Sequence, residues 1–99
     1  MKPRWTRRAF EDLRHLHEYI SQDNPAAANR MVSRIRDAVE RLGRHPHMGA
    51  KGRVEFTREL IIAGTPYIVV YVEDRGRVQI AAVIHGAMRW PDSFEGDKT

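Results

Sequence analysis

The chain has 99 residues, which is enough for one domain with a single core and too few for two. Hydrophobic residues make up 41% and charged residues 30% of the sequence, which excludes wholesale disorder, and the lack of cysteine excludes disulfides, thiolate metal sites and cysteine nucleophiles. The net charge is +4 and arginine carries nearly all of the positive charge, which favours an acidic macromolecular partner; the alternative is an ordinary solvated surface.

The N-terminal region predicts a short strand followed by a helix. Residues 3–5 are expected to form an edge strand, and Thr6 is a suitable N-cap for a helix from Arg7 to Ser21. The apolar residues of this helix recur every three or four positions and form one stripe, which consists of Phe10, Leu13, Leu16 and Ile20.

A second helix follows after a very short loop. Asn24 is its expected N-cap and Pro25 its first residue, because proline is well tolerated at that position. Apolar residues keep a helical period as far as Leu42, and Gly43 is the expected C-cap. The short loop predicts that the two helices form an antiparallel hairpin.

The C-terminal half predicts three strands. Residues 44–52 contain proline and glycine but no periodicity, so they are expected to form a loop. Strands are predicted at residues 57–62, 67–73 and 77–84, each rich in β-branched residues and joined to the next by a short turn. The first of them could extend back to residue 53.

Side-chain alternation in the last strand predicts which of its faces contacts the helices. That face is expected to carry Val78, Ile80, Ala82 and Ile84, and the opposite face Gln79, Ala81, Val83 and His85.

The predicted fold class is α+β, with an N-terminal α-helical hairpin packed on a small antiparallel β-sheet. A single domain is expected over residues 1–94, followed by a polar tail at residues 95–99. The predicted core consists of Leu13, Leu16, Ile20, Met31, Ile35, Val39, Leu60, Val70 and Ile80.

Four short segments carry recognisable sequence motifs. They are Thr6, Ala9, Asp12 and Leu13 in the first helix, Arg58-Glu59-Leu60, Gly64-Thr65-Pro66-Tyr67, and His85-Gly86-Ala87-Met88-Arg89-Trp90-Pro91. With the order of the elements, they resemble the RelE/ParE superfamily of bacterial toxins over nearly the whole chain. The last segment resembles the His-Gly-Ala-Arg-x-Trp-Pro ending of its ParE branch, although the arginine stands one place later, at Arg89.

The resemblance implies the toxin of a type II toxin–antitoxin system, held in a hetero-oligomer by a ParD-like antitoxin. ParE-like members act on DNA gyrase, so our interpretation is a non-enzymatic gyrase inhibitor that blocks replication. The candidate target contacts are Arg58, His85, Arg89 and Trp90. The antitoxin is expected in an apolar groove between the helices, at Leu13, His17, Ile20, Met31 and Ile35.

Two other functions stay open. RelE-like members cut mRNA on the ribosome, and His85 could act as the base of such a nuclease with Arg58 and Arg89 as phosphate clamps. The lysine cluster of that branch is absent, however, and Phe94 stands where its C-terminal tyrosine would be expected. The second alternative is a binding module that has lost toxicity.

The candidate residues also have purely structural interpretations. His85 could cap the end of its strand, Arg58, next to Glu59 in its strand, could form a cross-strand ion pair, and Trp90 could pack the C-terminal segment against the sheet.

Several ligand classes lack a supporting motif. The spacing of His15 with His17, and of His45 with His47, does not suit a metal site, and no glycine-rich phosphate loop follows a strand, so neither metal nor cofactor is expected. Acidic residues interrupt the basic ones on the helices, so sequence-specific DNA binding by this chain alone is not expected. The chain lacks an apolar run long enough to cross a bilayer and an apolar leader, so we expect a cytoplasmic protein without a membrane partner.

Overall fold

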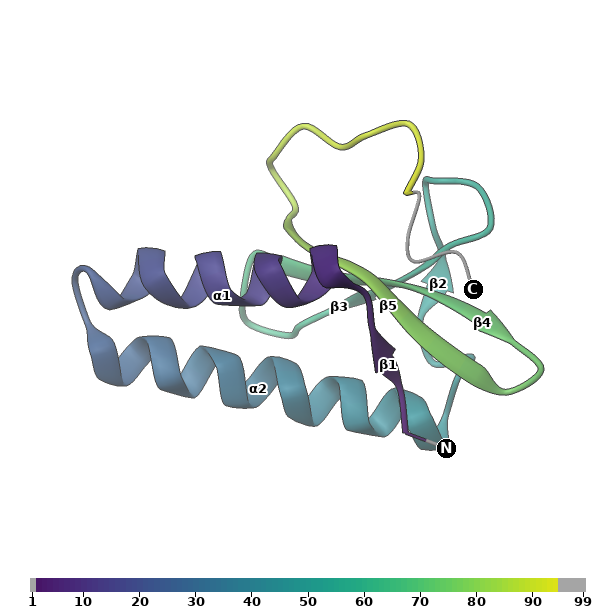
Figure 1. Cartoon of the computed structure of the whole chain (residues 1–99), viewed down its shortest axis with the longest axis horizontal. Helices are drawn as coiled ribbons and strands as arrows, with labels where there is room; N and C mark the ends of the chain where they lie inside the picture. The colour runs from purple at the N-terminus through teal and green to yellow at the C-terminus, as the bar shows by residue number, and fades with distance from the viewer. Residues whose placement is uncertain (1, 95–99) are drawn as a thin grey trace.

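The elements follow one another as β1 (Arg4–Trp5), α1 (Arg7–Ser21), α2 (Pro25–Arg44), β2 (Ala50–Lys51), β3 (Arg58–Ile61), β4 (Tyr67–Asp74) and β5 (Arg77–His85). The computed structural model describes residues 2–94, so the predicted polar tail lies outside the described residues (Figure 1).

The two helices form an antiparallel hairpin beside a sheet with strand order β1-β5-β4-β3-β2 (Figure 1). Neighbouring strands are antiparallel except β1, which runs parallel to β5 and makes the sheet mixed. The predicted α+β class, the helical hairpin and the N-terminal edge strand are confirmed. Within residues 2–94 no helix combines the length and the apolar character that crossing a membrane requires.

Side-chain oxygens cap the N-termini of both helices. Thr6 accepts a hydrogen bond from the Ala9 amide at 3.1 Å, and Asn24 accepts one from the Ala27 amide at 3.1 Å. The predicted end of α2 at Gly43 is wrong, because the helix continues to Arg44 and His45 is the cap residue. A residue that precedes proline is disfavoured in helical geometry, and His45, followed by Pro46, has φ −134° and ψ 73°.

The face of α1 that meets the sheet is shifted from the predicted stripe. Phe10 is 54% exposed, so its predicted place in the stripe is wrong, and Ala9 is buried instead. Its small side chain lets the N-terminal turn of α1 lie close to β5. Of the nine predicted core residues, six are buried; Ile20, Met31 and Leu60 are partly buried and pack against the core.

A β-bulge changes the faces of β5. Ile80 is opposite Tyr71 and Ala82 is opposite Val70, so Ala81 is an extra residue without a partner on β4. Beyond it the alternation is reversed: Val83 packs among the helix-facing residues, whereas Ala82 and Ile84 belong to the cluster on the other face. The predicted faces are therefore right for Val78 and Ile80 and wrong beyond the bulge.

Two side chains of the α1 region bind the backbone of β5 beside the bulge. The buried hydroxyl of Thr6 donates to the Ala81 carbonyl at 3.2 Å, and the carboxylate of Asp12 accepts from the Val83 amide at 3.0 Å. A bulge disturbs the regular ladder, and buried backbone groups need partners. These two bonds join α1 to β5 and account for threonine and aspartate at these positions.

The opposite face of the sheet is covered by the C-terminal segment, residues 86–94, which follows β5 (Figure 1). Trp90 and Phe94 pack there against the second apolar cluster. The C-terminal segment thus shields the central strands β4 and β5 on this face, whereas Ile61 of β3 is 68% exposed. The apolar residues of this second cluster are Ile68, Val70, Ala81, Ala82 and Ile84.

The segment between α2 and β3 differs from the predicted loop and strand extension. Within residues 44–52 the structure forms the short edge strand β2, which pairs with β3. Residues 53–57 form a turn, closed by a bond from the Gly52 amide to the Thr57 carbonyl at 2.8 Å. The predicted strand extension to residue 53 is therefore wrong, because the chain reverses direction here.

Side chains of β4 hold the preceding loop. The buried Tyr71 hydroxyl donates to the Pro46 carbonyl at 2.8 Å and accepts from the Gly49 amide at 2.9 Å, and burial raises the pKa of this tyrosine. Glu73 accepts from the Gly76 amide at 2.9 Å and contacts His47 at 3.1 Å. These bonds, above all the one from Gly76, hold the pKa of Glu73 below its ordinary value.

This lowered pKa predicts a pH dependence of stability for the Glu73→Gln variant. When folding lowers the pKa of a carboxylate, the ionised group stabilises the folded protein at pH values above the pKa that it has in the unfolded chain. This stabilisation is lost as the pH falls through the pKa of the folded state. At pH 7 the variant should be less stable than the wild type, and the difference should shrink as the pH falls below 4.5. Urea unfolding at several pH values measures this, and a difference that is undiminished in acid would contradict it.

Candidate functional site

A groove of about 870 Å³ opens between α1 and the chain that leaves β5. Most of its exposed lining is apolar, and it carries two large exposed side chains: Tyr19 of α1, 72% exposed, and Met88, 64% exposed. The strands contribute Tyr67, Val83 and His85 to the lining. An exposed, mostly apolar groove of this size suits a ligand with an apolar face.

His85 lies at the end of β5 and lines the groove. Its ring meets that of Tyr67 edge to face, with 5.6 Å between the ring centroids. The Nδ1 atom of His85 accepts a hydrogen bond from the Ala87 amide at 3.1 Å, so the neutral ring carries its proton on Nε2. Burial raises the pKa of the Tyr67 hydroxyl. His85 thus closes the strand end, the structural role considered from the sequence, and also faces the groove.

Arg58 makes different contacts from those expected. Its guanidinium donates to the Gly49 carbonyl at 2.8 Å. Glu59 binds Arg53 instead, through the backbone amide at 2.7 Å and through two guanidinium nitrogens at 3.1 and 3.2 Å. Within the described residues Arg58 thus binds a backbone carbonyl and is in none of the ion pairs, so the cross-strand ion pair considered from the sequence is not formed there.

The strand register separates Arg58 from His85. Arg58 is opposite Tyr71 and His85 is opposite Tyr67, so their positions are four residue steps apart on β4, about 13 Å along the strand. Arg89 lines the same groove as His85. The structure therefore brings together two of the three residues considered for a nuclease and places Arg58 elsewhere.

Trp90 packs the C-terminal segment against the sheet, as considered from the sequence. It is partly buried against the outer apolar cluster, and the Arg53 guanidinium carbon lies 3.7 Å from its ring centroid. Its indole Nε1 is the one buried side-chain polar atom without a hydrogen-bond partner in the described part of the chain. A similar stack joins Arg8 to Phe94, at 5.1 Å. Two arginines thus hold this segment in place.

The residues considered for antitoxin binding face inward. Leu13 and Ile35 are buried in the core between the helices and the sheet, and Ile20 and Met31 pack at its margin. His17 contacts Asn29 of α2 at 2.8 Å, which joins the two helices. The apolar groove lies beside α1 and the C-terminal segment, a position that helical periodicity does not reveal because it depends on the path of the chain after β5.

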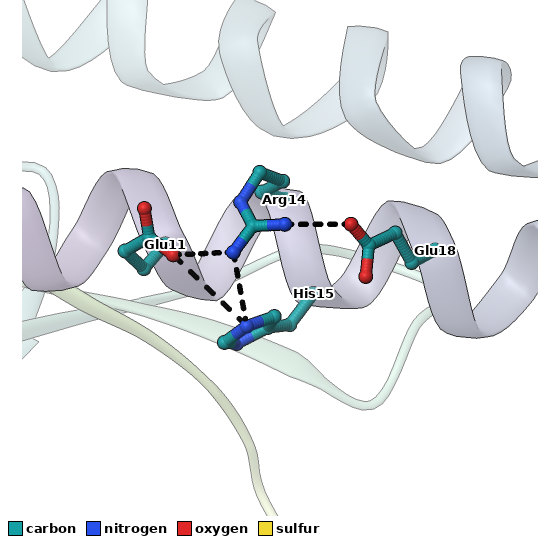
Figure 2. Close-up of polar contacts among 4 residues, drawn as sticks. All are labelled: Glu11, Arg14, His15 and Glu18. Carbon is teal, nitrogen blue, oxygen red and sulfur yellow. Dashed lines mark hydrogen bonds and ion pairs between the residues drawn. The ribbon is translucent and has the colours of Figure 1, made fainter.

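The outer face of α1 carries a network of fixed charges next to the groove (Figure 2). Arg14 binds Glu11 at 2.6 Å and Glu18 at 2.7 Å, and its Nη2 lies 3.3 Å from His15, a residue of the groove lining. The hydrogen bond with Arg14 lowers the pKa of Glu11 and raises that of Arg14. The paired charges make this face mixed rather than uniformly basic, so it does not suit a phosphate backbone.

Comparisons with known proteins agree on one family. The family model described as ParE toxin of type II toxin-antitoxin system, parDE, matches residues 4–90. Y4kP, an inferred toxin of Sinorhizobium fredii, is 44% identical over 88 residues, covering 89% of this chain and 91% of that protein. Toxin RelE2 of Caulobacter vibrioides is 36% identical over 83 residues, covering 84% and 92%.

A solved structure has the same fold. The structure titled chromosomal ParDE TA system from P. aeruginosa superposes with a TM-score of 0.74 and 24% sequence identity. The match covers 86% of this chain and 95% of that chain. The similarity therefore extends over most of the fold.

Proposed function

The chain belongs to the ParE toxin family of type II toxin–antitoxin systems, and from this we propose that it inhibits DNA gyrase and is neutralised by a ParD-like antitoxin. The observation that carries the proposal is the family match over residues 4–90, which includes the C-terminal motif around Arg89 and Trp90. Inhibition by binding needs no bond-breaking chemistry in the toxin. Gyrase acts in the cytoplasm, where the toxin would meet it.

The contacts of the C-terminal segment support a binding role. Arg89 is exposed at the groove, and Trp90 is held in place by the Arg53 stack. A rigid aromatic residue next to an exposed arginine is typical of residues that dominate a protein interface. A target can therefore be bound without much ordering of this segment.

The groove beside α1 is the proposed receptor for the antitoxin. Its lining is mainly apolar, and Tyr19 and Met88 project from it. The apolar face of an amphipathic antitoxin helix would fill such a groove. A flexible antitoxin segment that folds on binding would bury both side chains.

Messenger RNA cleavage is the second candidate function. One relative carries the name RelE2, and His85 with Arg89 lines a groove that is open to a ligand. Against this function, Arg58 lies at a distant register position, and Phe94 has no proton to transfer. An mRNA nuclease needs a base, an acid and phosphate clamps around one phosphodiester.

Expression without antitoxin, followed by separate pulse labelling of DNA and protein, tests the proposal. We expect DNA synthesis to fall early, with filamentous cells, while translation continues. Immediate translation arrest that is abolished in a folded His85→Ala variant would instead establish the nuclease. Normal growth with folded protein present would indicate a binding module without toxicity.

A further inference from the structure

Phe56 combines two unusual properties. Its side chain is 86% exposed, the highest exposure among the large hydrophobic residues of the described chain. Its φ angle is 66°, in the left-handed region that glycine adopts freely and that is strained for a bulky residue. Neither property contributes to the folded core, so the residue type is not explained by stability.

The rest of the turn holds Phe56 in this conformation. The Thr57 hydroxyl donates to the Val54 carbonyl at 2.6 Å, and Val54 itself is buried. Arg53 is fixed to Glu59 by three hydrogen bonds. The Phe56 ring is therefore presented at a defined position on a rigid turn, and ordering it on binding would cost little entropy.

The other residue with a side chain and a positive φ has an ordinary explanation. Arg75, with φ 54°, is followed by Gly76, with φ 80°, in the two-residue connection of the β4–β5 hairpin. Positive φ at both positions is the geometry such hairpins require. Phe56 lies in the longer connection of the β2–β3 hairpin, which the bond from the Gly52 amide to the Thr57 carbonyl closes. There the positive φ falls on a phenylalanine, whereas Gly76 takes the larger positive φ of the β4–β5 connection.

The surroundings of Phe56 indicate the kind of partner. A shallow pocket of about 470 Å³ beside it is lined by charges of both signs, from Lys51, Arg58, Glu55 and Glu73. Two carboxylates at this position would repel a nucleic-acid backbone. An apolar anchor within a rim of mixed charge is instead the pattern of a protein–protein contact.

The turn that carries Phe56 also contacts the C-terminal segment. Arg53, three residues before Phe56, stacks on Trp90, and the turn lies beside the last described part of the chain (Figure 1). The groove that we assign to the antitoxin is elsewhere, at the Tyr67 end of β4, whereas Phe56 is close to Arg58, which is opposite Tyr71. The Phe56 surface thus stays separate from the groove.

We propose that Phe56 is the apolar anchor through which the toxin holds its protein target, inserting into an apolar pocket whose rim carries charges of both signs that complement Lys51 and Glu55. This inference rests on the proposed function in taking the target to be a protein. Tight interfaces depend on a few such side chains that enter a pocket, and aromatic residues are frequent among them.

The Phe56→Gly variant separates this role from folding. Glycine relieves the strained backbone, so the variant should unfold at the same temperature as the wild type or higher. Its growth arrest should be lost and its binding to purified DNA gyrase weakened by about 30-fold or more, as for a dominant interface residue. Binding to the antitoxin should be unchanged.

Two variants serve as controls. Phe56→Tyr keeps the aromatic ring and should remain toxic. Phe10→Ala removes another exposed phenylalanine, on α1, and should also remain toxic. A folded Phe56→Gly protein that arrests growth like the wild type would overturn the proposal, and so would loss of antitoxin binding with toxicity retained.

The readouts distinguish this proposal from the proposed function. Growth arrest does not depend on which target is hit. If the wild type stops growth without binding gyrase and Phe56→Gly does not stop growth, gyrase inhibition fails while the anchor role stands. If the wild type does not affect growth, both proposals fall.

Discussion

The Gly49→Ala variant should be destabilised by about 3 kcal/mol, because overpacking and the loss of buried hydrogen bonds act together at this site. An added Cβ would lie 2.7 Å from the Tyr71 ring and hydroxyl and 2.8 Å from the Glu59 carbonyl. Tyr71 is fully buried and the carbonyl belongs to β3, so neither can move aside cheaply. The hydrogen bonds of Tyr71 to Gly49 and Pro46 would be strained or broken.

Urea unfolding measures the loss of stability of the Gly49→Ala variant, and Gly86→Ala is the matched control. A Cβ at Gly86 would meet its nearest atoms at 3.4 Å, which requires only small adjustments. This control should cost less than about 1 kcal/mol, the range of surface substitutions without a special mechanism. Equal unfolding midpoints for the two variants would show that the Tyr71 site tolerates the extra methyl group.

Replacing Thr6 by valine, which has nearly the same shape, should cost about 2–4 kcal/mol. Loss of an N-cap costs about 1 kcal/mol, and leaving the buried Ala81 carbonyl without a partner costs about 1–3 kcal/mol. Thr6 is 1% exposed, so water cannot replace the missing hydroxyl. The variant should also loosen β5 beside its bulge, where the Ala81 carbonyl loses its donor.

Asn24→Ala separates the two contributions of Thr6. Asn24 caps α2 at an exposed position, so its loss should cost only the capping energy of about 1 kcal/mol. Thr6→Ser keeps the hydroxyl and should retain most of the stability. Equal free energies of unfolding for Thr6→Val and Asn24→Ala would mean that the bond to β5 contributes nothing.

The helices were predictable because their signals are local. Thr6 and Asn24 mark the N-termini of the two helices because their side chains can accept a hydrogen bond from a backbone amide of the first turn. The spacing of apolar residues gives the helix lengths to within a residue or two. The C-terminus of α2 was predicted at Gly43 because glycine often ends helices. The actual end is set by the backbone geometry of His45, which precedes Pro46. Phe10 was misplaced because Ala9, a small residue, is the one that lies against the sheet.

The bulge in β5 was not predictable from alternation. The residues after Ile80 are apolar on both faces of the strand. A one-residue shift of the alternation at Ala81 therefore moves no polar side chain into the core, and the sequence gives no sign of it. Only the pairing with β4 reveals the shift. The functional consequence is that His85 faces the α1 side, where it meets Tyr67 and the groove.

The candidate site was predicted in part. The motif that ends in Arg89 and Trp90 was found by its sequence, and the structure places it beside the groove and the outer face of the sheet. The separation of Arg58 from His85 depends on register, which a single sequence does not give. The strained conformation of Phe56 leaves no trace in composition, because the residue is neither glycine nor asparagine.

Gyrase inhibition is the central claim, and DNA supercoiling by purified gyrase tests it most directly. Added wild-type toxin should stop the supercoiling of relaxed plasmid, and toxin mixed beforehand with its antitoxin should not. Unchanged supercoiling at a molar excess of folded toxin, together with cleavage of ribosome-bound mRNA by the same preparation, would contradict the account.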